Sequence, residues 1–331
     1  MRYLPALFAS LFMTFASATA SAQTLCVYDP AGRTGFVFDW MEAWKLNAAG
    51  QGVTVELKPY TDEETAVNDF TAGQCDGVAA TGVRLQKFNR ASYTLEALAG
   101  VPDYTLFKSV LNTVQTNSRY ASMFTSGSYE TAGIYPLGAV YAFVRDRNID
   151  DISDFAGKRI AAMEYDATSL LVVERIGGVA VPVNLSSVSG AFNNGDVAAT
   201  FVPASAYTPF ELWHGLEGGG AVVKYPLLQV TMQIVINPSA FPAGFGTNSR
   251  TFAASQFDVA MQTVNKAEGE IKSSYWSEMN PEKVEEFERA MQRLRLELRD
   301  TGSYDANVLR LLRLARCNAD SSRWECASPV E

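Results

Sequence analysis

Two stretches of the sequence, Leu25-Cys26-Val27-Tyr28-Asp29 and Arg159-Ile160-Ala161-Ala162-Met163-Glu164-Tyr165-Asp166, decide the fold. Each is a short apolar run that ends in Tyr-Asp, and each opens the same series of elements. Periodicity and glycine stops predict a helix, a strand, a helix and a strand after both. These lie around 36–44, 53–57, 61–70 and 76–81 after the first stretch, and around 170–173, 179–183, 188–193 and 195–200 after the second.

The repeated series predicts the fold class. Strand-helix-strand-helix-strand, twice over, is the pattern of two open, mostly parallel α/β sheets. Right-handed crossovers place helices on both faces of each sheet. Chance similarity of small apolar strings is the alternative. The shared order of elements argues against it, as does the string Val-Ala-Ala-Thr at both 78–81 and 197–200.

Two long extended runs lie outside the repeats, at 134–144 and 230–237. One can carry the chain out of the first sheet and the other can bring it back, so together they predict a hinge and a cleft. Ligands of open α/β sheets sit beyond the carboxyl ends of the strands, which both domains would point at this cleft. We expect domain 1 at 23–139 and 231–275, domain 2 at 140–230, and C-terminal helices at 276–331 packed across both.

The segment 1–22 has the features of a secretory signal peptide. Arg2 precedes an apolar run from Leu4 to Phe15, and Ala20-Ser21-Ala22 supplies the small-x-small pattern that a signal peptidase needs. The run is short for a membrane span, although a retained anchor is the alternative. We therefore expect cleavage near Ala22 and a soluble, exported mature protein.

The composition excludes several classes of function. The chain has 27 Lys+Arg against 36 Asp+Glu, a formal charge of −9, and so lacks the excess of cations that nucleic-acid binding requires. Its one histidine, His214, rules out a multi-histidine metal site and argues against a histidine-centred triad. Gly218-Gly219-Gly220 lacks the Lys-Ser/Thr of a phosphate loop. We expect no metal, no cofactor and no nucleic-acid partner.

Four cysteines, an even number, suggest disulfide bonds in an exported protein. Four cysteines allow three pairings, and we favour Cys26–Cys75 with Cys317–Cys326. The second bond would close a short loop near the C-terminus. A zinc site is the weaker alternative, because neither pair has CxxC spacing.

The C-terminal region predicts two helices. Asn280 and Pro281 suit the N-cap and the first position of one helix, and a second spans about 305–316. Arginines gather near the end of the first helix, at positions 293, 295 and 299, where they suit the helix dipole. A solvated helix face is the simpler interpretation of these arginines, and a docking patch is the alternative.

Several strings together resemble one family. They are Cys26-Val-Tyr-Asp-Pro30, Lys58-Pro-Tyr-Thr-Asp-Glu63, Ala72-Gly-Gln-Cys-Asp-Gly-Val-Ala79, Thr81-Gly-Val-Arg84, Ala132-Gly-Ile-Tyr-Pro-Leu-Gly-Ala139, Phe192-Asn-Asn-Gly195, Ala206-Tyr-Thr-Pro-Phe-Glu-Leu212 and Phe241-Pro-Ala-Gly-Phe-Gly246. From about Leu25 to Trp276 the chain resembles the periplasmic solute receptors of TRAP transporters, and among them the AdeT-like solute-binding proteins. The resemblance implies a two-domain periplasmic binding protein fold that closes on a hinge. It also implies a small polar ligand, membrane transporter subunits as partners and a place in the periplasm; we expect a monomer.

One departure from this family concerns the ligand. TRAP receptors generally carry an arginine on the first strand of the second domain, shortly after a Gly-x-Lys-like string, to bind a ligand carboxylate. Here that string is Gly157-Lys158-Arg159-Ile160, and the position of the arginine falls on Ala161. The resemblance therefore carries over neither this carboxylate contact nor an organic acid as the ligand.

The strand ends and the first crossing supply the candidate ligand-binding residues, which are Tyr28, Asp29, Thr81, Arg84, Tyr135, Tyr165, Asp166, Tyr207 and Glu211. Tyrosine offers an apolar ring and one hydroxyl to a small polar ligand. Arg84 can bind a carboxylate or phosphate through two parallel hydrogen bonds, whereas the acids can hold an amine among the tyrosines. Structural alternatives are helix capping for the two aspartates, a surface ion pair for the arginine, and ordinary packing for Tyr165 and Tyr207.

We expect a receptor with no catalytic residue. Two other classes stay open. A periplasmic enzyme of lyase type would use the cleft carboxylates as acid and base. An efflux-associated component is the third reading, although long coiled-coil heptads, typical of the usual adaptors, are absent from the sequence.

Overall fold

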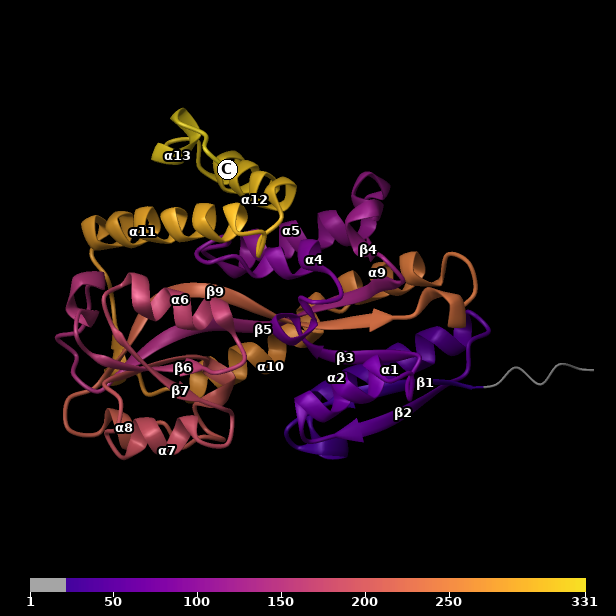
Figure 1. The fold of residues 1–331 in the computed structure, drawn as a ribbon, viewed down its shortest axis with the longest axis horizontal. Coiled ribbons are helices and arrows are strands. Elements are labelled where there is room, and N and C mark those ends of the chain that lie inside the picture. Colours follow the sequence, from indigo (N-terminus) through magenta and orange to yellow (C-terminus); the bar gives the residue numbers. More distant parts are fainter. Residues whose placement is uncertain (1–21) are drawn as a thin grey trace, which may run out of the picture.

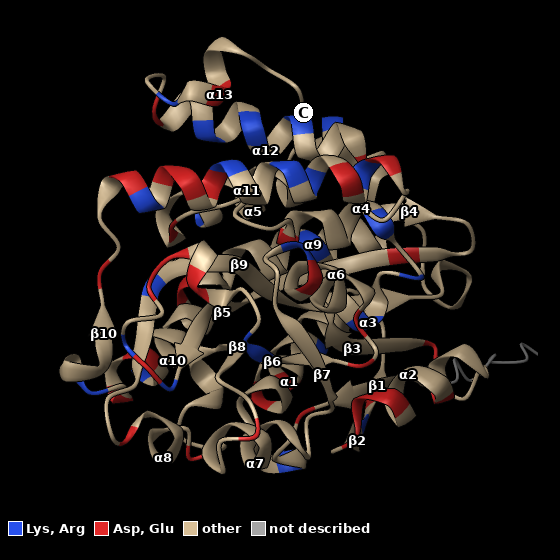
Figure 2. Ribbon diagram, turned by 60° about the vertical axis from the view of Figure 1, so that its left-hand side comes forward, with Lys and Arg blue, Asp and Glu red and all other residues tan. Residues whose placement is uncertain are grey.

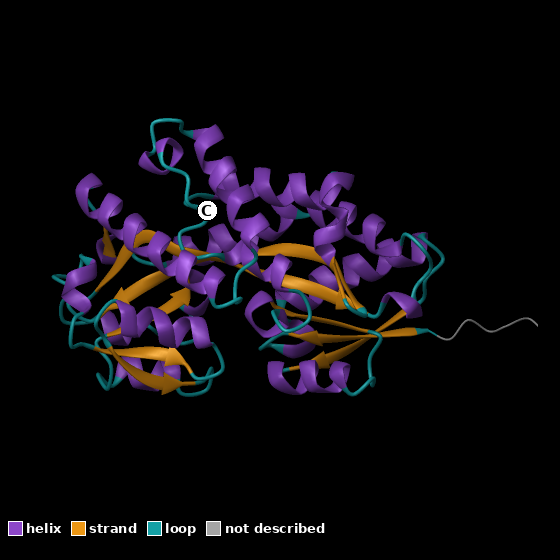
Figure 3. Ribbon diagram, turned by 45° about the horizontal axis from the view of Figure 1, so that its top comes forward, coloured by secondary structure: helices purple, strands orange, loops and turns teal. Residues whose placement is uncertain are grey.

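One mixed sheet runs through the whole molecule, a computed structural model that describes residues 22–331. The predicted signal segment lies outside the described residues, apart from Ala22 at its end. The strand order is β2-β1-β3-β9-β5-β8-β6-β7. Helices cover both faces of the sheet near its two ends (Figures 1 and 3). The predicted α/β class is therefore confirmed.

The first end of the sheet, here called the first lobe, contains three parallel strands. They are β1 (Gln23–Tyr28), β2 (Val55–Tyr60) and β3 (Gly77–Thr81), joined by α1 (Phe36–Gly50) and α2 (Glu63–Thr71). Most of β1 and β3 is buried because helices cover both faces of these strands. The first predicted series of elements is thus confirmed.

The other end of the sheet, the second lobe, repeats this arrangement. Its strands β6 (Arg159–Met163), β7 (Val179–Val183) and β8 (Ala199–Pro203) are parallel, and α6 (Ala167–Arg175) and α7 (Val188–Asn193) connect them. In the first lobe, Tyr28 is the last residue of β1 and Asp29 follows it. In the second lobe, Tyr165 and Asp166 both follow β6. The duplication predicted from the sequence is therefore present in the fold.

Two long antiparallel strands join the lobes. The strand β5 (Tyr129–Val144) pairs with β8, and β9 (Ala221–Ile236) pairs with β3. β5 and β9 also pair with each other. The predicted crossing runs are confirmed, but the second starts at Ala221 rather than at residue 230. Pro226 does not stop this strand, because it falls where the β5–β9 register shifts and no ladder bond needs its nitrogen. The exact domain boundaries stay a prediction.

Shorter elements complete the chain. The helices are η1 (Gly32–Thr34), α3 (Gly82–Leu85), α4 (Arg90–Tyr93), η2 (Thr94–Glu96), α5 (Tyr104–Thr116), η3 (Ser118–Phe124), η4 (Ile152–Phe155), η5 (Ala204–Ala206), α8 (Trp213–Leu216), η6 (Pro238–Ala240), α9 (Phe245–Ser255), α10 (Phe257–Glu270), η7 (Ser273–Tyr275), α11 (Pro281–Asp300), α12 (Ala306–Ala319) and α13 (Trp324–Ala327). The short strands are β4 (Thr125–Ser126) and β10 (Trp276–Ser277). No helix within 22–331 is long and apolar enough to cross a membrane.

The predicted C-terminal helices are present, and α11 lies along both lobes. Arg175 of the second lobe pairs with Glu297 at 2.6 Å, whereas Arg295 donates a hydrogen bond to the carbonyl of Leu98, which precedes α5, at 2.6 Å. Figure 2 shows acidic and basic residues along this helix. Arg295 is only 2% exposed, so this arginine belongs to neither a solvated face nor a docking patch.

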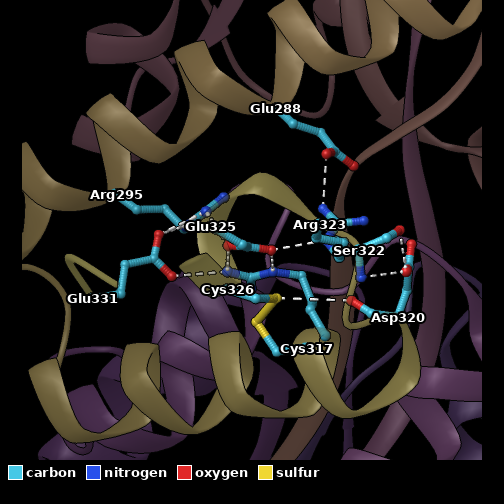
Figure 4. The surroundings of a disulfide bond; sticks show 10 residues. Glu288, Arg295, Cys317, Asp320, Ser322, Arg323, Glu325, Cys326 and Glu331 are labelled. Carbon is cyan, nitrogen blue, oxygen red and sulfur yellow. Dashed lines mark hydrogen bonds and ion pairs between the residues drawn. A yellow bond between two sulfur atoms is a disulfide. The ribbon is translucent and has the colours of Figure 1, made fainter. Parts of the chain in front are cut away.

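Both favoured disulfides, Cys26–Cys75 and Cys317–Cys326, are formed. The second lies beside a buried ionic cluster that fixes the chain end (Figure 4). There Arg316 donates to both carboxylate oxygens of Glu325, at 2.7 and 2.6 Å, and to Glu331 at 2.8 Å.

Candidate functional site

The two lobes meet where the carboxyl ends of their parallel strands face one another. Arg84 lies on α3, which begins directly after β3, and Tyr165 follows β6. The guanidinium carbon of Arg84 lies 3.5 Å from the centroid of the Tyr165 ring. A second contact joins the hydroxyls of Tyr93 and Thr168 at 3.1 Å. Residues from both lobes thus form one interlobe site.

The guanidinium of Arg84 keeps hydrogen-bonding capacity free. Its Nε lies 3.5 Å from Glu63 Oε2, and its Nη1 lies 3.7 Å from Glu64 Oε2. Both are ion pairs, but the buried Nε–H has no hydrogen-bond partner. A planar cation with unused donors can accept a carboxylate or phosphate in a bidentate manner.

Glu63 positions this cation, and sequence reasoning missed it. Its buried carboxylate accepts hydrogen bonds from the backbone N–H and the hydroxyl of Thr81, at 2.8 and 2.7 Å. Burial raises the pKa of Glu63, while the bonds from Thr81 and the charge of Arg84 oppose that rise. The one available signal was the place of Glu63 in the first turn of α2, which suggests only that its charge interacts favourably with the helix dipole.

Tyr28 and Tyr165 approach the same place from opposite lobes. Burial raises the pKa of both phenols, and the charge of Glu63 raises it further. Tyr165 adds to the rise in the pKa of Tyr28. Both hydroxyls therefore stay protonated at neutral pH and are available as donors to a ligand.

The two candidate aspartates cap helices. Asp29 accepts hydrogen bonds from the backbone N–H groups of Ala31, Val37 and Phe38, at 2.8, 2.8 and 3.2 Å. Gly35 is required beside it, because a Cβ there would lie 1.8 Å from Asp29 Oδ1. Asp166 caps α6 through the N–H of Thr168 at 2.9 Å, and burial raises its pKa to about 6. The capping alternative thus describes what these carboxylates do.

Tyr135 belongs to an aromatic wall that sequence reasoning did not assemble. Its ring stacks on Trp40 at a centroid distance of 5.9 Å, and Trp40 contacts Phe36 at 5.0 Å. Leu185, from the loop after β7, packs against the hydrophobic core of the first lobe, to which Trp40 and Tyr135 belong. The Tyr135 hydroxyl is buried and has no partner. The spacing of Phe36 and Trp40 identified a helix face, but nothing in it specified the strand opposite.

Tyr207 and Glu211 are placed differently. Tyr207 packs between Phe143 and Trp213 inside the second lobe. Glu211 is exposed beside a hollow of about 440 Å³ that His214 also lines. In the described part of the chain, neither forms a hydrogen bond, ion pair or ring contact with Arg84 or Tyr165. Their role in binding stays a prediction.

Glu96 lies behind the interlobe site, against the crossing strand β9. It is fully enclosed and accepts hydrogen bonds from the backbone N–H of Thr231, at 2.8 Å, and from its hydroxyl. Burial raises the pKa of Glu96 to about 8; the bonds from Thr231 oppose this, and the charges of Asp166 and Glu63 add to it. The residues described include no group of three or more His, Cys, Asp or Glu that could hold a metal ion.

Comparison with known proteins agrees with this architecture. The family model for "Solute-binding protein AdeT 1/2" matches residues 43–331. The protein named "Probable solute-binding protein AdeT1" of Acinetobacter baumannii is 34% identical over 303 residues, which are 91% of this chain and 99% of that protein. AdeT2 of the same species is 23% identical over 198 residues, covering 60% of this chain and 83% of its own.

Solved structures of TRAP periplasmic solute binding proteins share the fold. The one from Roseobacter denitrificans, with bound β-D-glucuronate, has a TM-score of 0.69 at 14% identity and covers 88% of this chain and 99% of its own. The one from Ralstonia eutropha, with bound (S)-2-acetolactate, has a TM-score of 0.66 at 14% identity and covers 90% and 99%. At such identity the likeness shows the fold alone, and it confirms the expected periplasmic binding protein architecture.

Proposed function

This chain belongs to the AdeT 1/2 solute-binding protein family, and from that premise we propose that it captures one small polar solute between its lobes and delivers it to a membrane transporter. The contact of Arg84 with Tyr165 is the observation that carries the proposal. It joins a cation on one lobe to a ring on the other, at the edge of the sheets where open α/β folds bind their ligands.

The solute carries an anionic group that Arg84 binds. The guanidinium plane is already oriented by the Tyr165 ring, and its buried Nε–H, although ion-paired with Glu63, has no hydrogen-bond partner. The carboxylates of Asp29 and Asp166, which could have held an amine, instead accept hydrogen bonds from the N-termini of helices. Relatives with this fold bind glucuronate, acetolactate and orotic acid, all of them carboxylates or their acids.

The binding arginine comes from the first lobe rather than the second. Ala161, the position that the family pattern gives to arginine, is a buried residue inside β6. Arg84 therefore substitutes for that arginine from across the cleft. Tyr28, Thr81 and Tyr165 surround the bound group, and the wall of Phe36, Trp40 and Tyr135 bounds the rest of the solute.

Closure follows from contacts on both sides. A solute shifts an open–closed equilibrium only if it binds the closed state more tightly, and one held by Arg84 and Tyr165 together does so. The lobes would turn about the crossing strands β5 and β9, with domain 1 at 23–139 and 231–275 and domain 2 at 140–230. We expect the mature protein to act as a periplasmic monomer, after cleavage near Ala22.

A thermal-shift screen of small polar metabolites tests this function. Carboxylates that raise the Tm of the wild-type protein should fail to do so with Arg84→Gln, while Arg33→Gln, an exposed arginine elsewhere in the first lobe, should keep the shift. The absence of any stabilising metabolite, or an equal response of Arg84→Gln, would contradict the proposal. Turnover of a stabilising metabolite would favour the lyase alternative instead.

A further inference from the structure

A broad groove lies away from the interlobe site, on the outer side of the first lobe. It has a volume of about 1590 Å³ and runs between α5, η3 and α12. Figure 1 shows α12 above α5, at the C-terminal side of the molecule. None of the residues that line it belongs to the interlobe site.

The part of the lining that is apolar is here called the floor of the groove, although most of the lining residues are polar or charged. It includes Leu106 and Val110 of α5, and Leu311 and Leu314 of α12. Leu314 is 44% exposed, one of few large apolar side chains left so open in the described chain. Exposed apolar groups inside a groove are typical of a surface that a partner covers.

The rim of the groove is basic although the whole protein is acidic. Four cations, Lys87, Arg90, Arg119 and Arg310, line it against two acids. Both acids are engaged, because Asp103 caps α5 and Asp305 caps α12.

Three of these cations are left without an acidic partner. Arg90 lies 3.9 Å from Asp305, whereas Lys87, Arg119 and Arg310 form no ion pair in the part of the chain that the structure describes. The groove thus combines an apolar floor with unneutralised positive charge, in a chain of formal charge −9. Figure 2 shows Lys and Arg residues along α12.

We infer that this groove, between α5 and α12, docks an acidic amphipathic helix of a partner protein. An apolar stripe with spacings of three and four residues would lie on the leucine floor, and carboxylates would face the basic rim. A helix of 13 residues, about 20 Å long, matches the lengths of the two helices that flank the groove, α5 with 13 residues and α12 with 14. A groove of this shape favours a rod-like segment over a flat membrane surface.

Three stapled 13-residue helical peptides provide the test. They share one leucine stripe and carry Glu, Gln or Lys at all other positions, and their binding to the whole mature protein is measured by fluorescence anisotropy. We expect the Glu peptide to bind at least tenfold more tightly than the Gln peptide, with the Lys peptide weakest. Added salt should weaken the binding of the Glu peptide more than that of the other two peptides.

Matched variants locate the binding. Arg119→Glu with Arg310→Glu should weaken the Glu peptide at least tenfold, whereas Arg33→Glu with Arg293→Glu changes the net charge equally at exposed arginines outside the groove and should have little effect. Leu314→Ser should likewise weaken binding, and Leu46→Ser on α1 should not.

Several results would overturn the inference. They are no binding of any peptide, equal binding of all three, or equal loss in both double variants. Binding to phosphatidylglycerol vesicles but to no peptide, lost on Arg119→Glu with Arg310→Glu, would assign the groove to a membrane surface. A dimer in light scattering that these substitutions dissociate would assign it to a second copy of this chain.

Discussion

The guanidinium of Arg84 lies over the ring of Tyr165, 3.5 Å from its centroid, so a cation on the first lobe contacts an aromatic ring on the second. Arg84 stands just beyond the end of β3, the last strand of the first series, and Tyr165 just beyond the end of β6, the first strand of the second. The internal duplication thus brings one member of each repeat to a shared place. Sixteen-residue strands β5 and β9 connect the lobes behind it.

This contact predicts a measurable coupling. In a double-mutant cycle on the free energy of unfolding, Arg84→Gln and Tyr165→Leu should couple by about 0.5–2 kcal/mol, the range for cation–π pairs. The control cycle uses exposed Arg33 and buried Phe38, whose guanidinium carbon and ring centroid are 5.5 Å apart, and the longer distance should give a smaller coupling. Additive effects of the Arg84 and Tyr165 substitutions would mean that the lobes do not meet there in solution.

The two disulfides should differ in their contribution to stability. The Cys26–Cys75 bond spans 49 positions and the Cys317–Cys326 bond spans 9. By the loop-entropy relation, replacing the first pair with Ala should cost about 4 kcal/mol and replacing the second about 2.6 kcal/mol. Urea denaturation of both variants measures the difference. A smaller cost for the first pair would show that the loop-entropy relation does not govern these bonds.

Buried Glu96 predicts that stability falls as the pH rises. The pKa of Glu96 in the folded state, about 8, lies above its pKa in the unfolded state. At a pH between these two pKa values, the folded state therefore holds a proton that the unfolded state has lost. Glu96 thus contributes a decline of about 1.4 kcal/mol per pH unit up to about 8. Burial also raises the pKa of Asp166, to about 6, so the contribution of Asp166 to the decline in stability falls mostly below pH 6.

Urea denaturation between pH 6.5 and 8 isolates this contribution. Glu96→Gln should flatten the decline, because the amide imitates the protonated acid. Glu64→Gln, at a side chain 65% exposed beside Arg84, should keep the wild-type slope. The same slope in Glu96→Gln as in the wild type would contradict the assignment.

The C-terminal ionic cluster predicts one large and one small substitution effect. Burial would raise the pKa of Glu325, but its bonds to Arg316 and Arg323 lower it to about 2. Arg316→Met leaves this carboxylate buried with one partner fewer, and should cost about 3–5 kcal/mol. Lys224→Met removes an exposed pair with Glu278 and should cost under about 1 kcal/mol. Equal costs would argue that the cluster is open to solvent.

Much of the fold could be predicted from local patterns. The series of strands and helices and the two crossing runs follow from alternation and glycine stops. The cysteine count predicts disulfides but allows three pairings, of which the favoured one is formed. The early start of β9 could not, because Pro226 normally ends a strand and only the bulge opposite β5 accommodates it. The burial of Arg295 could not either, since its partner carbonyl at Leu98 is 197 positions away.

The site was predictable only in part. Strand ends identified Arg84 and Tyr165, because every parallel sheet presents its carboxyl ends at one edge. Glu63 and the wall around Trp40 depend on how α1 and α2 lie against those ends, which one sequence does not reveal. Asp29 shows the opposite limit, since an acid after a strand looks the same whether it caps a helix or binds a solute.

The distance between the lobes tests the central claim most directly. All four cysteines are in disulfides, so Leu46→Cys on α1 and Val179→Cys on β7, both at exposed positions, provide unique sites for a spin-label pair. Double electron–electron resonance with a solute that raises the Tm should give one narrow distance distribution, and the same protein after removal of the solute should give a longer and broader one. Identical distributions in the two states would contradict closure of the lobes around a bound solute.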